Sequence, residues 1–176
     1  RQLTRDEFDD DAPQWSPDGT SIVYVSERGT RQLAVIERVL DQPVVRLLTH
    51  APFEHQGPWW DPNGEGVYFS SDEQDGRYNI YRMDVRTAEI RQLTHTRMGL
   101  FWPRPSPDGK TLLVTAFEGG SQQIYSIPED RLKGLKDQPV ARWTDDVPAL
   151  EPSALPDQLA TVKFRFEDAV GVTPRP

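Results

Sequence analysis

The chain has 176 residues, of which 28 are acidic and 20 are basic, so its formal net charge is −8. Its basic residues form no cluster, which excludes a nucleic-acid partner because phosphate binding needs clustered lysine and arginine. The hydrophobic fraction of 36% is enough for a core, and no apolar run approaches the roughly 18 residues of a membrane-spanning helix. The composition therefore predicts a folded protein that does not span a membrane.

Proline, glycine and cysteine usage narrows the class further. Sixteen prolines and twelve glycines are spread along the chain, which favours many tight turns. Because cysteine is absent, disulfides, thiolate catalysis and cysteine-ligated zinc are excluded. A chain without cysteine is compatible with an exported bacterial protein.

A period of 45 residues runs through the sequence. The same step separates the members of three sets, namely Leu3-Thr4, Leu48-Thr49 and Leu93-Thr94; Pro17, Pro62 and Pro107; and Gly19, Gly64 and Gly109. A weaker fourth copy begins near Trp143. We therefore expect propeller-type repeats within residues 1–166, at about 1–44, 45–89, 90–139 and, in part, 140–166, followed by an exit strand or linker at 167–176.

Each repeat contains the pattern of four short strands. In the first repeat, Trp15 to Gly19 predicts a strand end followed by a proline-aspartate-glycine turn. Residues 22–25 predict the antiparallel return strand, 33–36 a third strand, and a fourth ends at the Leu-Thr pair. The return strand has counterparts at 67–69 and 112–114, and the third strand at 80–83 and 124–127. Because these apolar runs are continuous, we expect both faces of each sheet to be buried.

Four antiparallel strands per period are typical of a β-propeller blade. A long sandwich gives no reason for a constant register, and helical repeats would need a 3.6-residue periodicity that is absent. The predicted fold class is all-β: a β-propeller of four-stranded antiparallel blades, with about three full blades and a partial fourth. Such a ring is incomplete, and three solutions remain open: a fragment of a six-bladed or larger ring, a ring closed by another chain, or a compact four-bladed ring.

The segment from Ala12 to Gly19, with Arg1-Gln2-Leu3-Thr4 before it, resembles the WD-like propeller repeat of the TolB family. The later copies resemble it with departures, since Asp61 replaces the serine and Pro105 replaces the tryptophan. The resemblance covers about residues 1 to 165. It implies a fold shared by TolB, which resides in the bacterial periplasm and binds the peptidoglycan-associated lipoprotein and Tol partners, and by propeller domains of exported peptidases and outer-membrane proteins.

Motifs for catalysis are missing from the sequence. It has no His-Glu-x-x-His stretch, no Gly-x-Ser-x-Gly elbow and no phosphate-binding glycine loop. We therefore expect no catalytic residue and no cofactor. His50 and His95 follow the Leu-Thr pair at the same repeat position and are interpreted as loop-entry residues, whereas His55 breaks the repeat and is a candidate contact residue.

The acidic run Asp9, Asp10 and Asp11 is the candidate for a hard cation such as calcium. It lacks the Asp-x-Asp-x-Asp-Gly spacing of a dedicated loop, so the preferred interpretation is a solvated acidic surface and no metal site.

Tryptophans fall into two groups. Trp15 and Trp60 share one repeat position and are expected in the blade core, while Trp59 and Trp102 each occur in one copy only. In a four-stranded meander, the loops joining blades and those between second and third strands emerge at the same end. The candidate partner-binding residues at this end are Phe8, Asp10, Asp11, Arg28, Phe53, His55, Trp59, Arg77, Arg97, Phe101 and Trp102. Their aromatic and arginine content suits a protein contact, although Phe101 and Trp102 could instead fill gaps between blades.

These patterns predict a non-catalytic scaffold that binds a protein or peptide, such as an envelope lipoprotein or a membrane complex, in the bacterial periplasm or elsewhere outside the cytoplasm. The alternative is the gating propeller of an exported peptidase or an outer-membrane protein whose catalytic part lies outside this chain.

Overall fold

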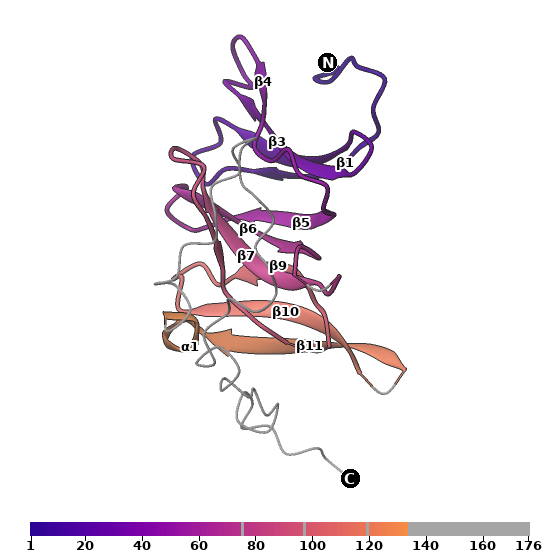
Figure 1. Cartoon of the computed structure of the whole chain (residues 1–176). Helices are drawn as coiled ribbons and strands as arrows, with labels where there is room; N and C mark the ends of the chain where they lie inside the picture. The colour runs from indigo at the N-terminus through magenta and orange to yellow at the C-terminus, as the bar shows by residue number, and fades with distance from the viewer. Residues whose placement is uncertain (75, 97, 119, 134–176) are drawn as a thin grey trace.

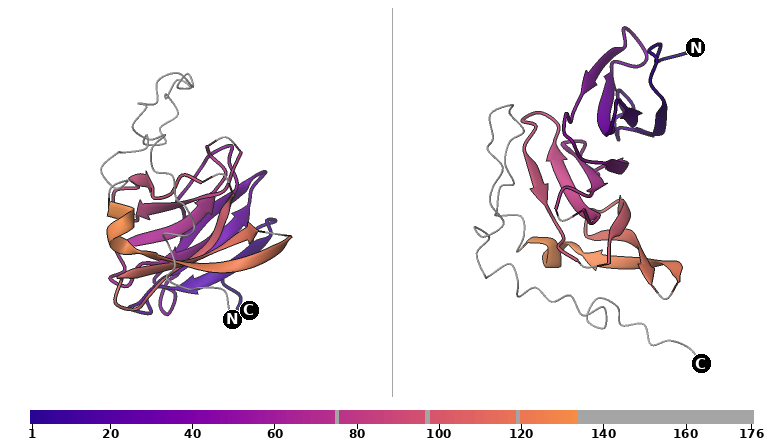
Figure 2. Two further views of the ribbon diagram at one scale, coloured as in Figure 1. Left: turned by 90° about the horizontal axis from the view of Figure 1, so that it is seen from below. Right: turned by 45° about the vertical axis from the view of Figure 1, so that its right-hand side comes forward.

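The computed structural model describes residues 1–74, 76–96, 98–118 and 120–133. In this part of the chain the strands form three antiparallel sheets that stack in chain order (Figures 1 and 2). The predicted partial repeat at 140–166 and the linker at 167–176 lie outside the described residues. Among the residues described, no helix has the length and apolar character needed to cross a membrane.

Strand order within each sheet follows the chain, so each sheet is a meander. The first contains β1 (Asp10–Trp15), β2 (Ile22–Glu27), β3 (Arg31–Glu37) and β4 (Val44–Leu47). The second contains β5 (His55–Trp60), β6 (Gly66–Ser71), β7 (Asn79–Asp84) and β8 (Ile90–Gln92). The third contains β9 (Leu100–Pro105), β10 (Thr111–Glu118) and β11 (Ser121–Pro128), followed by the helix α1 (Glu129–Lys133). These meanders confirm the predicted all-β class with propeller blades.

The sheets approach one another along one edge. Strands β1, β5 and β9 are the first strand of each sheet, and β5 contacts both of the others. The outer strands β4 and β8 have their principal contacts within their own sheets. The first strands are therefore the inner strands of a radial arrangement, as in a propeller.

Two apolar clusters fill the spaces between neighbouring sheets. Val25 and Leu33 of the first sheet pack with Phe69 and Tyr81 of the second. On its other face, the second sheet contributes Ile80 to a cluster with residues of the third, including Leu112, Val114 and Ala116. As predicted, β2 and β6 are buried on both faces. The same expectation is wrong for β10, where buried and exposed residues alternate because Leu113 and Phe117 point away from the stack.

The repeated Leu-Thr pair has a packing role and a hydrogen-bonding role. Leu48 and Leu93 are buried in the clusters between sheets. The hydroxyl Oγ1 of Thr49 accepts a hydrogen bond from the Leu33 N–H at 2.8 Å, and Thr94 accepts one from Ile80 at 2.9 Å. The pair therefore ties the end of each blade to its own third strand.

The proline-aspartate-glycine turns have the same geometry in the first and third blades. The Ser16 hydroxyl donates to Asp18 at 2.6 Å, and that carboxylate accepts the Thr20 N–H at 3.0 Å. These bonds lower the pKa of Asp18. Neighbouring turns lie close together, since a Cβ on Gly64 would lie 3.7 Å from Pro17 Cδ.

The expectation that Trp15 lies in the core is wrong. Trp60 is 6% exposed and its Nε1–H donates to the Gln14 carbonyl of the preceding blade at 3.3 Å. Trp15 is 54% exposed. A tryptophan at this repeat position is buried by the inner strand of the preceding blade. Among the described residues, no blade covers Trp15 in this way.

Candidate functional site

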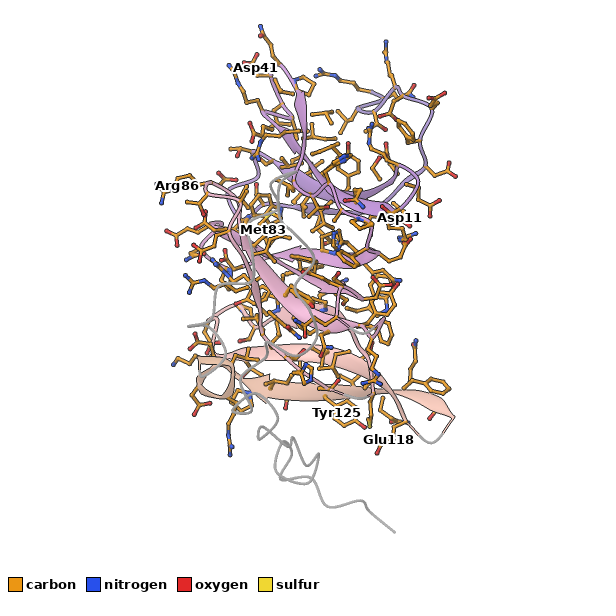
Figure 3. All side chains as sticks on the ribbon, in the orientation of Figure 1. Asp11, Asp41, Met83, Arg86, Glu118 and Tyr125 are labelled. Atoms are coloured by element: carbon orange, nitrogen blue, oxygen red, sulfur yellow. The ribbon has the colours of Figure 1, made fainter. Side chains whose placement is uncertain are left out.

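The sheets present two different ends. One end carries the loops that lead into β1, β5 and β9 and the turns that follow β2, β6 and β10; we call it the interblade face. The opposite end, the turn face, carries the proline-aspartate-glycine turns and the connections after β3 and β7. Figure 3 shows Asp11 and Glu118 at the interblade face and Asp41 and Arg86 on the opposite side. The loops predicted to share one end therefore do so.

Phe8 and Arg28 form the first contact pair on the interblade face. The guanidinium carbon of Arg28 lies 4.2 Å from the centre of the Phe8 ring, which is a cation–π distance. Arg28 also pairs with Asp6, and its Nε donates to the Ser26 hydroxyl at 3.2 Å. The loop before β1 and the β2–β3 turn are thus held together through one arginine.

In the acidic run beside this pair, Asp11 is engaged in an ion pair. Arg31 pairs with Asp11 at 2.6 Å and with Glu27 at 2.9 Å. Burial, and then the charge of Asp10, raise the pKa of Tyr24 to about 12. Within the described ranges, no group of three histidine, aspartate or glutamate side chains could hold a metal ion, the run Asp9 to Asp11 included.

The loop before β5 is tied to the first blade. Gln32 Nε2 donates to the carbonyls of Ala51 at 2.7 Å and Phe53 at 3.3 Å, and Glu54 accepts the Arg31 N–H at 3.3 Å. Phe53 is half-buried in this loop. Arg77, in the β6–β7 turn, is exposed, whereas Arg97 lies outside the described residues.

His55 does not lie on the contact surface, so its placement there requires correction. It is 0% exposed and packs edge-on against Phe69, with ring centres 5.2 Å apart. Among the described residues neither ring nitrogen has a hydrogen-bond partner. Burial lowers the pKa of His55 to about 4, so the ring is neutral at pH 7. The physical reason is that β5 begins at His55, which makes it a sheet residue paired with Ser71 rather than a loop residue.

Phe101 and Trp102 have different environments. Phe101 is half-buried and packs on Tyr78 of the second blade, with ring centres 4.8 Å apart, which agrees with the gap-filling alternative. Trp102 is 36% exposed, and its backbone N–H donates to the Ser70 hydroxyl at 3.1 Å. Trp102 therefore presents an aromatic surface, while Phe101 joins two blades.

A bulge occurs at the same repeat position of the inner strands β1, β5 and β9. Ala12, Gly57 and Trp102 are 45 residues apart and have φ values of 51°, 57° and 54°. The strand register shifts at each of these sites. The Trp102 ring lies over Gly57, where a Cβ would come within 2.6 Å of Trp102 Cε3. Glycine at this position of the second blade therefore makes room for the tryptophan of the third.

The prediction that Trp59 lies at the interblade face is wrong. Trp59 lies near the opposite end of β5, where the strand enters the β5–β6 turn. The Arg104 guanidinium carbon lies 4.1 Å from the centre of the Trp59 ring. Gln14, Trp59 and Arg104 occupy the same repeat position on the three inner strands. Sequence reasoning missed Arg104, although the 45-residue step from Trp59 leads directly to it.

Comparisons with known proteins agree with this architecture. A sequence model of the TolB β-propeller domain matches residues 12–134. No curated protein matches the chain.

Solved structures also match the chain. A putative TolB from Agrobacterium tumefaciens is 25% identical, with a TM-score of 0.60 over 66% of this chain and 44% of that one. TolB from Acinetobacter baumannii is 24% identical, with a TM-score of 0.56 over 68% of this chain and 30% of that one. A puromycin-hydrolyzing peptidase from Mycobacterium tuberculosis is 19% identical, with a TM-score of 0.63 over 75% of this chain and 22% of that one. The chain thus spans less than half the length of each.

Proposed function

Because the chain belongs to the TolB β-propeller domain family, we propose that it is a non-catalytic scaffold that binds a protein or peptide partner through its interblade face. The observation that carries the proposal is the Phe8–Arg28 pair, an aromatic ring and an arginine held together at this face. Aromatic and arginine side chains are the residue types that dominate the binding energy of protein interfaces.

The interblade face is organised in a way that favours binding. Asp6 and Ser26 hold the Arg28 side chain, so less conformational entropy is lost when a partner orders it. Asp11 and Glu27 remain more than half exposed although they pair with Arg31. The face therefore mixes aromatic, cationic and anionic groups, a combination that suits a protein surface of mixed charge.

We place this scaffold outside the cytoplasm, with an envelope lipoprotein or a membrane complex as its partner. The resemblance of the repeats to those of the TolB family supports this location, and the lack of cysteine agrees with it. Fractionation of the native host should recover the protein in the periplasmic fraction. Recovery in the cytosol alone would contradict this part of the proposal.

Site-specific photo-crosslinking in the native host tests the binding face. A photoreactive residue replaces Arg77 on the interblade face or, as the matched control, Arg86 on the opposite side; both arginines are exposed. We expect a crosslinked protein from position 77 and none from position 86. Crosslinks from position 86 alone, or co-purification of a small molecule without any protein, would contradict the proposal. A hydrolase domain on the same native polypeptide would favour the peptidase alternative.

A further inference from the structure

Arg104 has an unusual environment for a partly buried arginine. Its Nη1 donates to two neutral acceptors, the carbonyls of Pro103 at 2.9 Å and Gly57 at 3.4 Å. Its guanidinium also stacks on Trp59 at 4.1 Å. These contacts fix the orientation of the group, but none of them neutralises its charge.

The other partly buried arginines of the described chain all have a carboxylate partner. Arg28 pairs with Asp6, Arg31 with Asp11, Arg82 with Asp61 and Arg91 with Glu89. Arg104 has no carboxylate within ion-pair distance in the described part of the molecule. A partly desolvated cation without a counter-ion is unfavourable, and burial lowers the pKa of Arg104 accordingly. A carboxylate placed beside the guanidinium would remove this penalty.

The unused side of the guanidinium has the geometry for a carboxylate. Within the described structure, Nε and Nη2 of Arg104 donate to no acceptor. Neither atom is among the buried unpaired donors, so both are accessible to a ligand. Two adjacent N–H groups of an arginine match the two oxygens of a carboxylate, and such charge-assisted bonds are about twice as strong as neutral ones.

One indole ring contacts this cation, and a second lies over the glycine to which the cation donates. Trp59 lies under the guanidinium, and the exposed Trp102 lies over Gly57, whose carbonyl accepts from Arg104. Indole surfaces favour a carboxylate attached to an organic group over a small inorganic anion, because the organic group can pack against the ring.

We propose that Arg104, Trp59 and Trp102, on the inner strands of the second and third blades, form a receptor site for a carboxylate group of a bound polypeptide. The carboxylate is either the C-terminus of the polypeptide or an aspartate or glutamate side chain, since both offer the same two oxygens. This site lies apart from the interblade face. The inference rests on the proposed binding function and adds a second contact, at which the bound polypeptide presents a carboxylate.

Indole N–H signals of the ¹⁵N-labelled full chain give a direct test, because the protein has five tryptophans. The Trp59 and Trp102 signals are assigned with Trp59→Phe and Trp102→Phe variants. The probes are N-acetyl-glycyl-leucine with a free carboxylate, the same dipeptide as its amide, N-acetyl-glutamate amide and N-acetyl-glutamine amide. We expect both signals to shift with at least one carboxylate probe and with neither neutral probe. Shifts from the C-terminal or the side-chain probe identify the source of the carboxylate.

Substitution of the arginine supplies the second arm. Arg104→Gln should weaken binding of the active probe by about tenfold or more, Arg104→Lys should weaken it less, and Arg86→Gln should leave it unchanged. Equal shifts with the amide probes, no shift with any probe, or unchanged affinity in Arg104→Gln would overturn the inference. The carboxylate-against-amide comparison uses the unsubstituted chain, so it does not depend on folding of a variant. If a partner is crosslinked at position 77 but no carboxylate probe binds, the proposed function is supported and only the carboxylate site is wrong.

Discussion

His55 shows how burial of a single side chain couples stability to pH. Burial lowers its pKa from 6.5 to about 4, so between these values the unfolded chain binds more protons than the folded one. The free energy of unfolding therefore falls as the pH drops through this window, by up to about 1.4 kcal/mol per pH unit. Burial also raises the pKa of Glu73 from 4.5 to about 7, which stabilises the folded state as the pH drops. The two groups act in opposite directions, so His55 must be isolated by substitution.

We predict that His55→Leu removes this acid sensitivity. Between pH 7 and pH 5, the stability of the unsubstituted protein should fall by about 2 kcal/mol relative to the variant, since the Glu73 contribution is common to both. Urea unfolding at the two pH values measures the difference. His50→Leu is the control, because His50 is exposed, and it should follow the unsubstituted protein. If His55→Leu keeps the same pH dependence as the unsubstituted chain, His55 is not buried as described.

Asp61 shows how one element accommodates a departure from the repeat. Ser16 and Ser106 occupy the same position, and their hydroxyls accept the N–H groups of Ser21 and Thr111. Asp61 accepts the N–H of Glu65, one repeat position earlier, at 2.9 Å, and it adds a buried charge. Arg82 on β7 neutralises it through Nη2 at 2.5 Å and Nε at 3.2 Å.

Removing Arg82 should therefore be costly. We predict that Arg82→Met destabilises the protein by about 3–5 kcal/mol, because Asp61 would stay buried without a partner. Adding Asp61→Ser, which restores the residue of the other repeats, should recover most of this loss. The exposed pair Arg46–Glu37 supplies the control, and Arg46→Met should change stability by less than about 1 kcal/mol. Denaturant unfolding measures all four proteins. Equal losses for Arg82→Met and Arg46→Met would contradict the role given to the Asp61 pair.

The sequence could predict those features for which the same residue type recurs at the same position of each repeat. The turn and Leu-Thr anchors mark each blade, so the all-β class and the common end of the loops follow from a 45-residue step. The inner-strand bulge could not be predicted, because Ala12 and Trp102 are not residues that normally indicate a positive φ. His55 was misplaced for a related reason: whether it ends a loop or begins β5 depends on pairing with Ser71, which lies outside the local pattern.

At the scale of the whole molecule, stability depends on contacts between successive blades. The Trp60 indole donates to Gln14 across the first interface, and Arg104 donates to Gly57 across the second. Stacked repeats bury their apolar faces only against neighbours, so weakening one interface affects the blades on both sides. Trp102 also packs over Gly57 across the second interface, and the methyl group of an alanine at position 57 would test this contact.

We predict that Gly57→Ala disrupts the interface between the second and third blades. Its Cβ would lie 2.6 Å from Trp102 Cε3 and 3.2 Å from Trp102 Cα, and an alanine at φ 57° adds backbone strain. Gly76→Ala is the matched control, since Gly76 has φ 64° and its Cβ would meet nothing within 4 Å. Denaturant unfolding should show a loss of about 1–2 kcal/mol for the control and a further 1–3 kcal/mol for Gly57→Ala.

The extra loss should depend on the indole ring. In a Trp102→Ala background, Gly57→Ala should lose no more than Gly76→Ala does, because the overpacked atoms are then absent and only the backbone strain remains. If Gly57→Ala and Gly76→Ala are equally destabilising in the unsubstituted background, Trp102 does not lie over Gly57. If the extra loss persists without the indole, a contact other than Trp102 causes it. The losses of stability caused by Gly57→Ala and Trp102→Ala should therefore be non-additive. This non-additivity would show that the packing of the second blade against the third depends on the bulge at Gly57.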